Sequence, residues 1–129
     1  MVAEAPAAEG SAGPGSEPGG IQISSTPALL RLVVWGYWPA QVVTAFALET
    51  PTLCQKLMPV GSFVLDAAQL KPQGAEGQAA LRGLFRSLSE VSFARGTIIA
   101  ENALTKMQLA RLVRESGLQG RVEFSDASP

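Results

Sequence analysis

The sequence contains no histidine and only one cysteine, Cys54, among its 129 residues. A single cysteine cannot form an internal disulfide, and a chain without histidine lacks the usual base of serine and cysteine nucleophiles and a common zinc ligand. A disulfide scaffold, a Cys/His zinc site and a histidine-dependent hydrolase are therefore disfavoured. Cys54 falls on an apolar helical stripe, which predicts a buried core thiol. We expect no metal and no cofactor.

Excess charge of one sign and long apolar runs are also missing. The formal net charge is -1, which is too small a bias to indicate nucleic-acid binding. No Lys or Arg precedes Arg31, and no uninterrupted apolar stretch approaches the ~18 residues that a membrane span needs. The sequence thus predicts a cytoplasmic protein that binds neither nucleic acid nor membrane.

The hydrophobic content of 47% nevertheless predicts a real core. Residues 1–20 consist almost wholly of Ala, Gly, Pro, Glu and Ser, and such a segment cannot bury enough apolar surface to offset its ordering entropy. We therefore expect a disordered tail over 1–20, a single domain over 21–126 and a flexible end over 127–129.

Strand-like and helix-like stretches alternate from residue 21 onward. Apolar and β-branched residues predict strands at 21–25, 28–35, 61–67, 96–101 and 121–124. Apolar residues at helical spacing predict helices over 39–57, 77–91 and 102–116. This alternation predicts an α/β fold: a small, mostly parallel sheet of four or five strands with helices packed over its faces.

The three predicted helices differ in how clearly they are marked. In the first, the apolar phase continues across Pro51, which favours either one helix bent there or two short helices that share a face. The second has the clearest stripe: Gly77, Ala80, Leu81, Leu84, Phe85, Leu88 and Val91. In the third, Asn102 is the expected cap and Gly117 the expected end, with Leu104, Leu109, Leu112 and Val113 on one side.

Two groups of side chains are candidates for chemistry. Asp66 and Glu101 follow apolar strand residues, so the pair could share acid/base work, although carboxylates that bond to loop N–H groups are the simpler interpretation. Trp35, Tyr37 and Trp38 are the only tryptophans and the only tyrosine, and they fall within four residues. We expect Trp35 in the core and leave Tyr37 and Trp38 open as ligand-binding residues.

The order of these elements resembles the STAS or SpoIIAA-like fold of anti-sigma factor antagonists. The resemblance covers roughly residues 21–124 and rests on these stretches: LRLVVWGYWPAQVV, FVLDAAQL, GQAALRGLFRSL, GTIIAEN and LARLVRESGL followed by RVEF. In that family, the loop between the central strand and its helix carries a serine, directly after an aspartate, that a partner kinase phosphorylates. The corresponding positions here are Gly74 and Ala75, so the resemblance implies an interaction module that lacks the phosphorylatable serine.

The leading hypothesis is therefore a non-catalytic regulatory module of bacterial type that binds another protein, such as a regulator or a kinase-like protein, with homodimerisation as a further option. Its expected partner surface is Lys71, Gln73, Gly74, Ala75, Glu76, Gln78 and Arg82. A basic helix face of Lys106, Arg111 and Arg114, joined by Arg121, is a further candidate for meeting an acidic partner. The alternatives are a nucleotide- or lipophilic-ligand domain that uses Tyr37 and Trp38, and an enzyme that uses Asp66 and Glu101.

Overall fold

The computed structural model describes residues 2–3, 19–26, 28–56, 61–90 and 93–125, over which strands and helices alternate. In chain order the elements are β1 (Val2–Ala3), β2 (Gly19–Ser25), β3 (Leu29–Gly36), α1 (Ala40–Lys56), β4 (Ser62–Leu70), α2 (Ala75–Ser89), β5 (Arg95–Ile99), α3 (Ala103–Glu115) and β6 (Val122–Ser125). The predicted α/β fold is confirmed, and β2 to β6 correspond to the five predicted strands.

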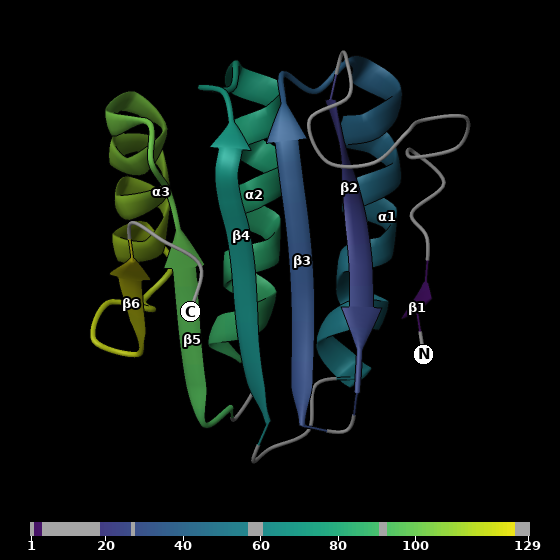
Figure 1. Ribbon diagram of the computed structural model, residues 1–129, viewed down its shortest axis with the longest axis vertical. Helices are drawn as coiled ribbons and strands as arrows, with labels where there is room; N and C mark the ends of the chain where they lie inside the picture. The colour runs from purple at the N-terminus through teal and green to yellow at the C-terminus, as the bar shows by residue number, and fades with distance from the viewer. Residues whose placement is uncertain (1, 4–18, 27, 57–60, 91–92, 126–129) are drawn as a thin grey trace.

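The strands form one sheet in the order of the sequence, from β1 at one edge to β6 at the other. The first three pair antiparallel, whereas β3, β4, β5 and β6 pair in parallel. From β3 to β6, each new strand is added to the same edge of the sheet. Because each crossover between parallel strands is right-handed, all the connecting helices lie on the same side of the sheet. Figure 1 shows all three helices behind the sheet. The helices predicted to pack over the sheet thus all lie on one of its faces.

The hairpin of β2 and β3 sets the side-chain pattern of the sheet. Leu32 pairs with Ile23, and Val34 with Ile21, and all four side chains are buried in the core beneath the helices. Because side chains alternate along a strand, the intervening residues, such as Arg31, lie on the opposite face. β3 ends at Gly36, whose φ of 72° places it in the left-handed region that favours glycine.

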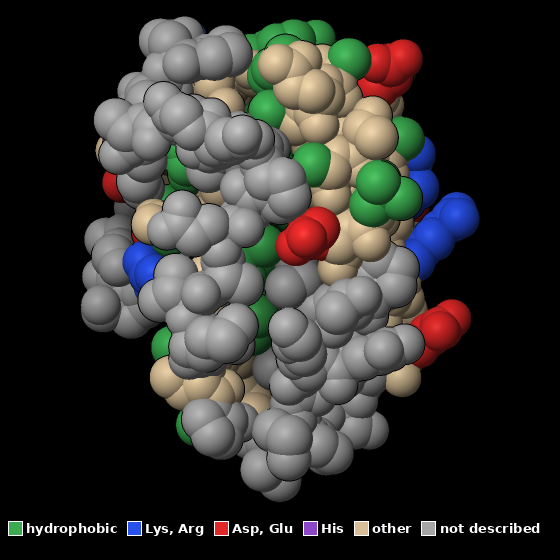
Figure 2. Space-filling model, turned by 90° about the vertical axis from the view of Figure 1, so that its right-hand side faces the viewer, with side chains coloured by type: hydrophobic (Ala, Val, Ile, Leu, Met, Phe, Trp, Pro, Cys, Tyr) green, Lys and Arg blue, Asp and Glu red, His purple; other side chains and the backbone are tan. Residues whose placement is uncertain are grey.

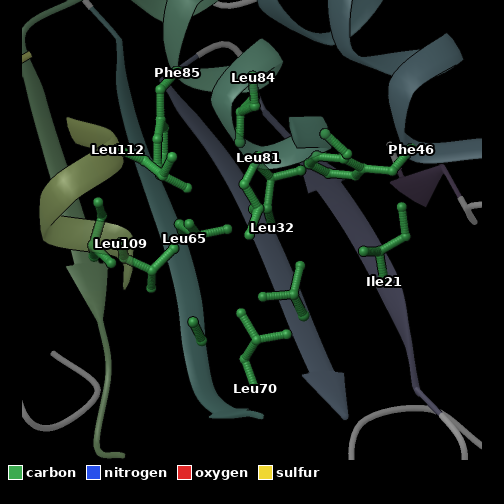
Figure 3. Close-up of a cluster of buried hydrophobic side chains, with 14 of the residues drawn as sticks. Ile21, Leu32, Phe46, Leu65, Leu70, Leu81, Leu84, Phe85, Leu109 and Leu112 are labelled. Atoms are coloured by element: carbon green, nitrogen blue, oxygen red, sulfur yellow. The ribbon is translucent and has the colours of Figure 1, made fainter. Parts of the chain in front are cut away.

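The core fills the space between the sheet and the helices. Leu32 and Leu65 of the two central strands point toward Leu81, Leu84 and Phe85 of α2 (Figure 3). Each of these side chains is at most 1% exposed, and burying one leucine or phenylalanine contributes about 1.5–3 kcal/mol. Phe46 of α1 and Leu109 and Leu112 of α3 complete the cluster.

The helix predictions hold with local corrections. α1 is one helix through Pro51, in which Val42 and Phe46 are buried, but Ala47 is exposed. The predicted core role of Cys54 falls outside the described side chains. Six of the seven residues in the α2 stripe are buried as predicted, and the seventh, Val91, lies outside the described residues.

In α3 the cap and the end were predicted correctly. The Asn102 side chain accepts hydrogen bonds from the backbone N–H groups of Leu104 and Thr105 at 2.9 and 3.0 Å, and Gly117 has a φ of 80°. The predicted burial of Leu104 is wrong, because its side chain is 54% exposed. Thr105 is buried instead, since it lies four residues before Leu109 and shares its face.

The predicted tail is partly ordered. Val2 and Ala3 form β1 beside β2, and β2 itself begins at Gly19. Residues 1, 4–18 and the predicted end at 127–129 lie outside the described residues. Within the described parts of the chain, no helix is both long enough and apolar enough to cross a membrane.

We predict opposite stability effects for two Gly→Ala substitutions. A Cβ at Gly96 would lie 2.5 Å from the Phe63 ring and 2.7 Å from Val122 Cγ1, so Gly96→Ala should lower the free energy of unfolding by about 1–3 kcal/mol. A Cβ at Gly83, in the exposed part of α2, would meet nothing within 4 Å, so Gly83→Ala should raise it by about 0.5–1 kcal/mol. Urea unfolding measures both changes in the free energy of unfolding. If the two substitutions change it by the same amount, the close packing around Gly96 is contradicted.

Candidate functional site

The predicted contact loop is shorter than the sequence indicates. β4 continues to Leu70, which is buried and pairs with Gly36 of β3, so the loop comprises only residues 71–74. The pairing shifts register between Val33 and Trp35, and this irregularity lets β4 continue through the small residues that follow Asp66. The strand predicted over residues 61–67 therefore extends to Leu70, and Asp66 lies within β4.

The side chain of Gln73 holds the loop against the end of β3. Its Nε2 donates to the backbone oxygens of Gly36 at 2.9 Å and Lys71 at 2.8 Å. Its Oε1 accepts from the backbone N–H of Trp38 at 3.1 Å. The side chain is 4% exposed, so these bonds satisfy buried backbone groups that would otherwise be costly. We expected Gln73 on the partner surface, and the structure corrects this: Gln73 supports the loop from inside.

Two further glutamines tie the same loop to the helices. Gln108 of α3 accepts from the backbone N–H of Gln73 at 2.9 Å and donates to its carbonyl oxygen at 3.1 Å. Gln78 of α2 donates to that same oxygen at 2.9 Å. Thr105 Oγ1 donates to the carbonyl oxygen of Leu70 at 2.9 Å. The loop is therefore fixed from β3, α2 and α3 at once.

The remaining predicted contact residues lie at or near the surface. Lys71, Ala75 and Glu76 are exposed, whereas Gly74, Gln78 and Arg82 are partly buried. Six of the seven residues are thus accessible to a partner. They lie in the loop and in the first half of α2.

The aromatic group separates into buried and exposed members. Trp38 is 3% exposed; its ring lies 4.9 Å from that of Phe46, and its Nε1 donates to the Gly20 carbonyl at 3.3 Å. This removes Trp38 from the possible ligand-binding residues. Trp35 is buried as expected. Tyr37 is 52% exposed, and a Cβ at Gly74 would come within 2.7 Å of its hydroxyl.

Asp66 and Glu101 do not form a shared acid/base site. The Asp66 carboxylate is 2.7 Å from the guanidinium of Arg31 and also accepts from the Ala68 N–H at 3.2 Å. It borders a cavity of about 250 Å³ that Glu101 does not line, and Glu101 is exposed beyond the end of β5. Among the described residues, no three His, Cys, Asp or Glu side chains cluster as metal ligands would.

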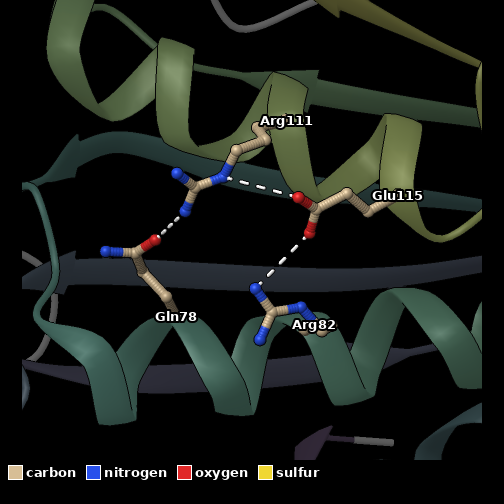
Figure 4. A network of polar contacts seen from close by, with 4 residues as sticks. All are labelled: Gln78, Arg82, Arg111 and Glu115. Atoms are coloured by element: carbon tan, nitrogen blue, oxygen red, sulfur yellow. Dashed lines mark hydrogen bonds and ion pairs between the residues drawn. The ribbon is translucent and has the colours of Figure 1, made fainter.

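A network of polar side chains bridges α2 and α3 next to the loop (Figure 4). Arg82 Nη2 lies 3.4 Å from Glu115 Oε1, and Arg111 Nε lies 3.9 Å from Glu115 Oε2. Arg111 also donates to the side-chain oxygen of Gln78. We call these four residues the α2–α3 seam. The sequence analysis placed Gln78 and Arg82 in one group and Arg111 in another, and it did not single out Glu115, because only the fold brings α2 and α3 side by side.

A groove lies on the other side of α2, between this helix and α1. Its volume is about 420 Å³, and its lining side chains are mostly small: Ala40, Val43, Thr44, Ala47, Glu76, Ala79 and Ala80. Figure 2 views the molecule from the α1 side and shows mostly apolar and uncharged surface over the upper right part. The α2 helix is thus flanked by an apolar groove and a charged seam.

Comparison with known proteins identifies the fold. The chain superposes on a crystal structure of an anti-sigma factor antagonist from Mycobacterium paratuberculosis with a TM-score of 0.57, covering 83% of this chain and 85% of that chain at 14% sequence identity. No protein-family model and no curated protein sequence matches the chain. The chain therefore has the STAS or SpoIIAA-like fold, as the sequence resemblance predicted.

We predict that Gln73→Glu destabilises the protein in a pH-dependent way. An ionised carboxylate would face the Gly36 and Lys71 carbonyl oxygens, which now accept from the amide, so the free energy of unfolding at pH 7 should fall by about 2–4 kcal/mol. Burial and these oxygens should raise the pKa of the introduced carboxyl above its unfolded value. Stability should therefore recover as the pH is lowered and the group protonates.

Urea unfolding at several pH values between pH 4 and pH 7 tests whether the stability of Gln73→Glu, relative to the wild type, rises as the pH is lowered. The matched control is Gln41→Glu on the exposed surface of α1, which should change stability by less than about 0.5 kcal/mol. A loss of stability at Gln73 that is the same at both pH values would show that the amide protons do not hold the loop.

Proposed function

We propose that this chain is a non-catalytic, cytoplasmic protein-interaction module in a bacterial-type regulatory system and that its partner is another protein. The STAS fold supports the regulatory class, because the similar solved structure is an anti-sigma factor antagonist. The loop before α2 supports a constitutive surface, since Gly74 and Ala75 carry no hydroxyl group to phosphorylate. The carboxylate pairing of Asp66 supports a non-catalytic role.

The observation that carries this proposal is Gly83 in the middle of α2. Glycine costs an exposed helix about 0.5–1 kcal/mol relative to alanine, and a Cβ here would meet nothing within 4 Å. The fold itself therefore gives no reason for a glycine at this position. Ala75, Ala79 and Gly83 are all exposed at four-residue spacing, so they form one row along the helix. A partner's backbone can approach such a row closely.

The neighbouring surfaces complete an interface around this row. The α1–α2 groove offers apolar area of the kind found in the buried centre of interfaces, and the charged seam offers a polar rim. Because Gln73, Gln78 and Gln108 fix the loop, little conformational entropy is lost when a partner binds there. We place the partner surface along α2 from residue 75 to residue 86.

The alternative functions receive less support. A hollow of about 670 Å³ follows α1, lined by Ala40, Gln41, Thr44, Ala45, Leu48 and Glu49, but it contains neither of the aromatic residues proposed for ligand binding. The cavity beside Asp66 measures about 250 Å³, which is below the usual 300–1,000 Å³ of ligand sites.

Homodimerisation of this chain, the further option from the sequence, is tested by analytical sedimentation of the purified chain.

The partner can be identified by site-specific photo-crosslinking. We expect a photoreactive amino acid at Ala79, which is exposed on α2, to capture one protein in cells that produce the chain naturally. The matched control is the same amino acid at Ala94, which is exposed before β5 at the opposite end of the sheet. Equal capture of the same proteins from both positions would contradict a surface on α2.

We predict that Gly83→Leu weakens binding to this partner without unfolding the chain. The added side chain projects into solvent in the free protein but should block close approach, which should raise the dissociation constant by roughly tenfold or more. Isothermal titration calorimetry measures the affinity, and circular dichroism confirms the fold. The control Ala94→Leu should leave the affinity unchanged. If Gly83→Leu binds as tightly as the wild type, the row along α2 is not the interface.

A further inference from the structure

We propose that the α2–α3 seam binds a carboxylate side chain supplied by an acidic segment of the partner, and that Glu115 occupies this position when the partner is absent. The inference rests on the proposed function for the presence of a protein partner. It adds the chemistry of that partner and an internal carboxylate that competes with it.

The ion pairs of Glu115 are loose. Its oxygens lie 3.4 Å from Arg82 and 3.9 Å from Arg111, whereas charge-assisted hydrogen bonds are usually about 2.7–2.9 Å long. The structural pair of Arg31 and Asp66 has this short distance, at 2.7 Å. Glu115 is also 46% exposed in its side chain. An incoming carboxylate can therefore displace it at little cost.

The seam also has more positive charge and more donors than Glu115 can use. Two guanidinium groups face one carboxylate, and each guanidinium carries five N–H donors in a planar fork suited to bidentate binding. The helices that form the seam carry five basic residues against two acidic ones: Arg82, Arg86, Lys106, Arg111 and Arg114 against Glu76 and Glu115. The whole chain has a formal net charge of -1, so this excess is local.

Neighbouring amides hold one of the two arginines in position. Gln78 accepts from Arg111 through its oxygen and donates to the Gln73 carbonyl through its nitrogen, at 2.9 Å. The Arg111 guanidinium is thus connected to the fixed loop before α2. Such support lowers the entropy lost when a ligand binds. A carboxylate fits this site better than a nucleic acid, because two paired arginines beside a glutamate do not make the extended basic strip that a phosphate backbone needs.

The test uses the full chain and a fluorescein-labelled decapeptide of glutamate, with a decaglutamine peptide as the uncharged probe, in fluorescence anisotropy at low salt. Glu115→Gln removes the competing carboxylate and should tighten binding of the glutamate peptide roughly threefold to tenfold. Arg82→Gln and Arg111→Gln should each weaken it by a similar factor. The matched control is Arg95→Gln, at the exposed start of β5 and outside both the seam and the proposed partner surface, which should change it less than about twofold.

Several outcomes would overturn the inference. The first is that Glu115→Gln leaves the affinity for the glutamate peptide unchanged or lowers it. The second is that the decaglutamine peptide binds as tightly as the glutamate peptide. The third is that an oligothymidylate of matched charge binds more tightly than the glutamate peptide through the same arginines. These results are distinguishable from failure of the proposed function. If a crosslinked partner binds the Glu115→Gln, Arg82→Gln and Arg111→Gln variants with wild-type affinity, the seam does not bind the partner's carboxylate, but the proposed surface on α2 stands. If the glutamate peptide binds as expected but no partner is captured from Ala79, the proposed partner surface on α2 is wrong and carboxylate binding by the seam stands.

Discussion

The buried amide of Gln73 determines where the chain leaves the sheet. It is bonded to backbone groups of Gly36, Trp38 and Lys71, which belong to two crossovers that are distant in sequence. An apolar residue of the same size would remove all three of these bonds, and a buried group left without a partner, such as the Trp38 N–H, costs about 1–3 kcal/mol. Through Gln108 the same loop is bonded to α3. The side chain of Gln73 thus ties the loop to the end of β3, and the backbone of the same residue ties the loop to α2 and α3.

The one-sided helical layer gives this arrangement its functional consequence. Because the sheet order follows the sequence, all three helices lie side by side on one face (Figure 1). Consecutive parallel crossovers then place the α1–α2 groove and the α2–α3 seam on either side of a single helix. On the opposite face, Arg31 and Asp66 form a short ion pair across β3 and β4. Asp66, one of the two carboxylates that the sequence offered for acid/base work, is therefore separated from the helical surface by the sheet itself.

The sequence predicted most of the elements but fewer of the side-chain roles. Periodicity located α2 because its apolar residues are large and evenly spaced, and the Asn102 cap and Gly117 end could be read from residue type alone. Periodicity failed where local signals were weak. The predicted strand ended at Ala67, although β4 continues through Ala68 and Gln69 to Leu70. Leu104 looks like part of the apolar stripe of α3, but its side chain is exposed and Thr105 is buried instead.

The part of the site that could not be predicted depends on contacts between distant residues. The sequence predicted a contact loop over residues 71–76, and in the structure the loop comprises residues 71–74, with residues 75 and 76 in the first turn of α2. Gln73 was expected on the surface because glutamine is usually exposed, and nothing local shows that its amide matches three backbone groups. Likewise, Arg82 and Arg111 are 29 positions apart in the printed sequence. Their shared contact with Glu115 arises only when α2 and α3 pack next to each other.

The proposed surface along α2 has no hydroxyl group at Gly74 or Ala75, so it would have to be controlled in a way other than phosphorylation at these positions. In a switched module, a phosphate at the start of the helix adds about two negative charges next to the helix dipole and changes partner affinity. Here Glu76 places a carboxylate in the first turn of α2, and hydrogen bonds of Gln73 hold the neighbouring loop. The charge and shape of the surface are therefore constant at a given pH. Occupancy of such a surface depends on the concentration of the partner and on any competitor for the same groups, and within this chain the only competitor we propose is the carboxylate of Glu115.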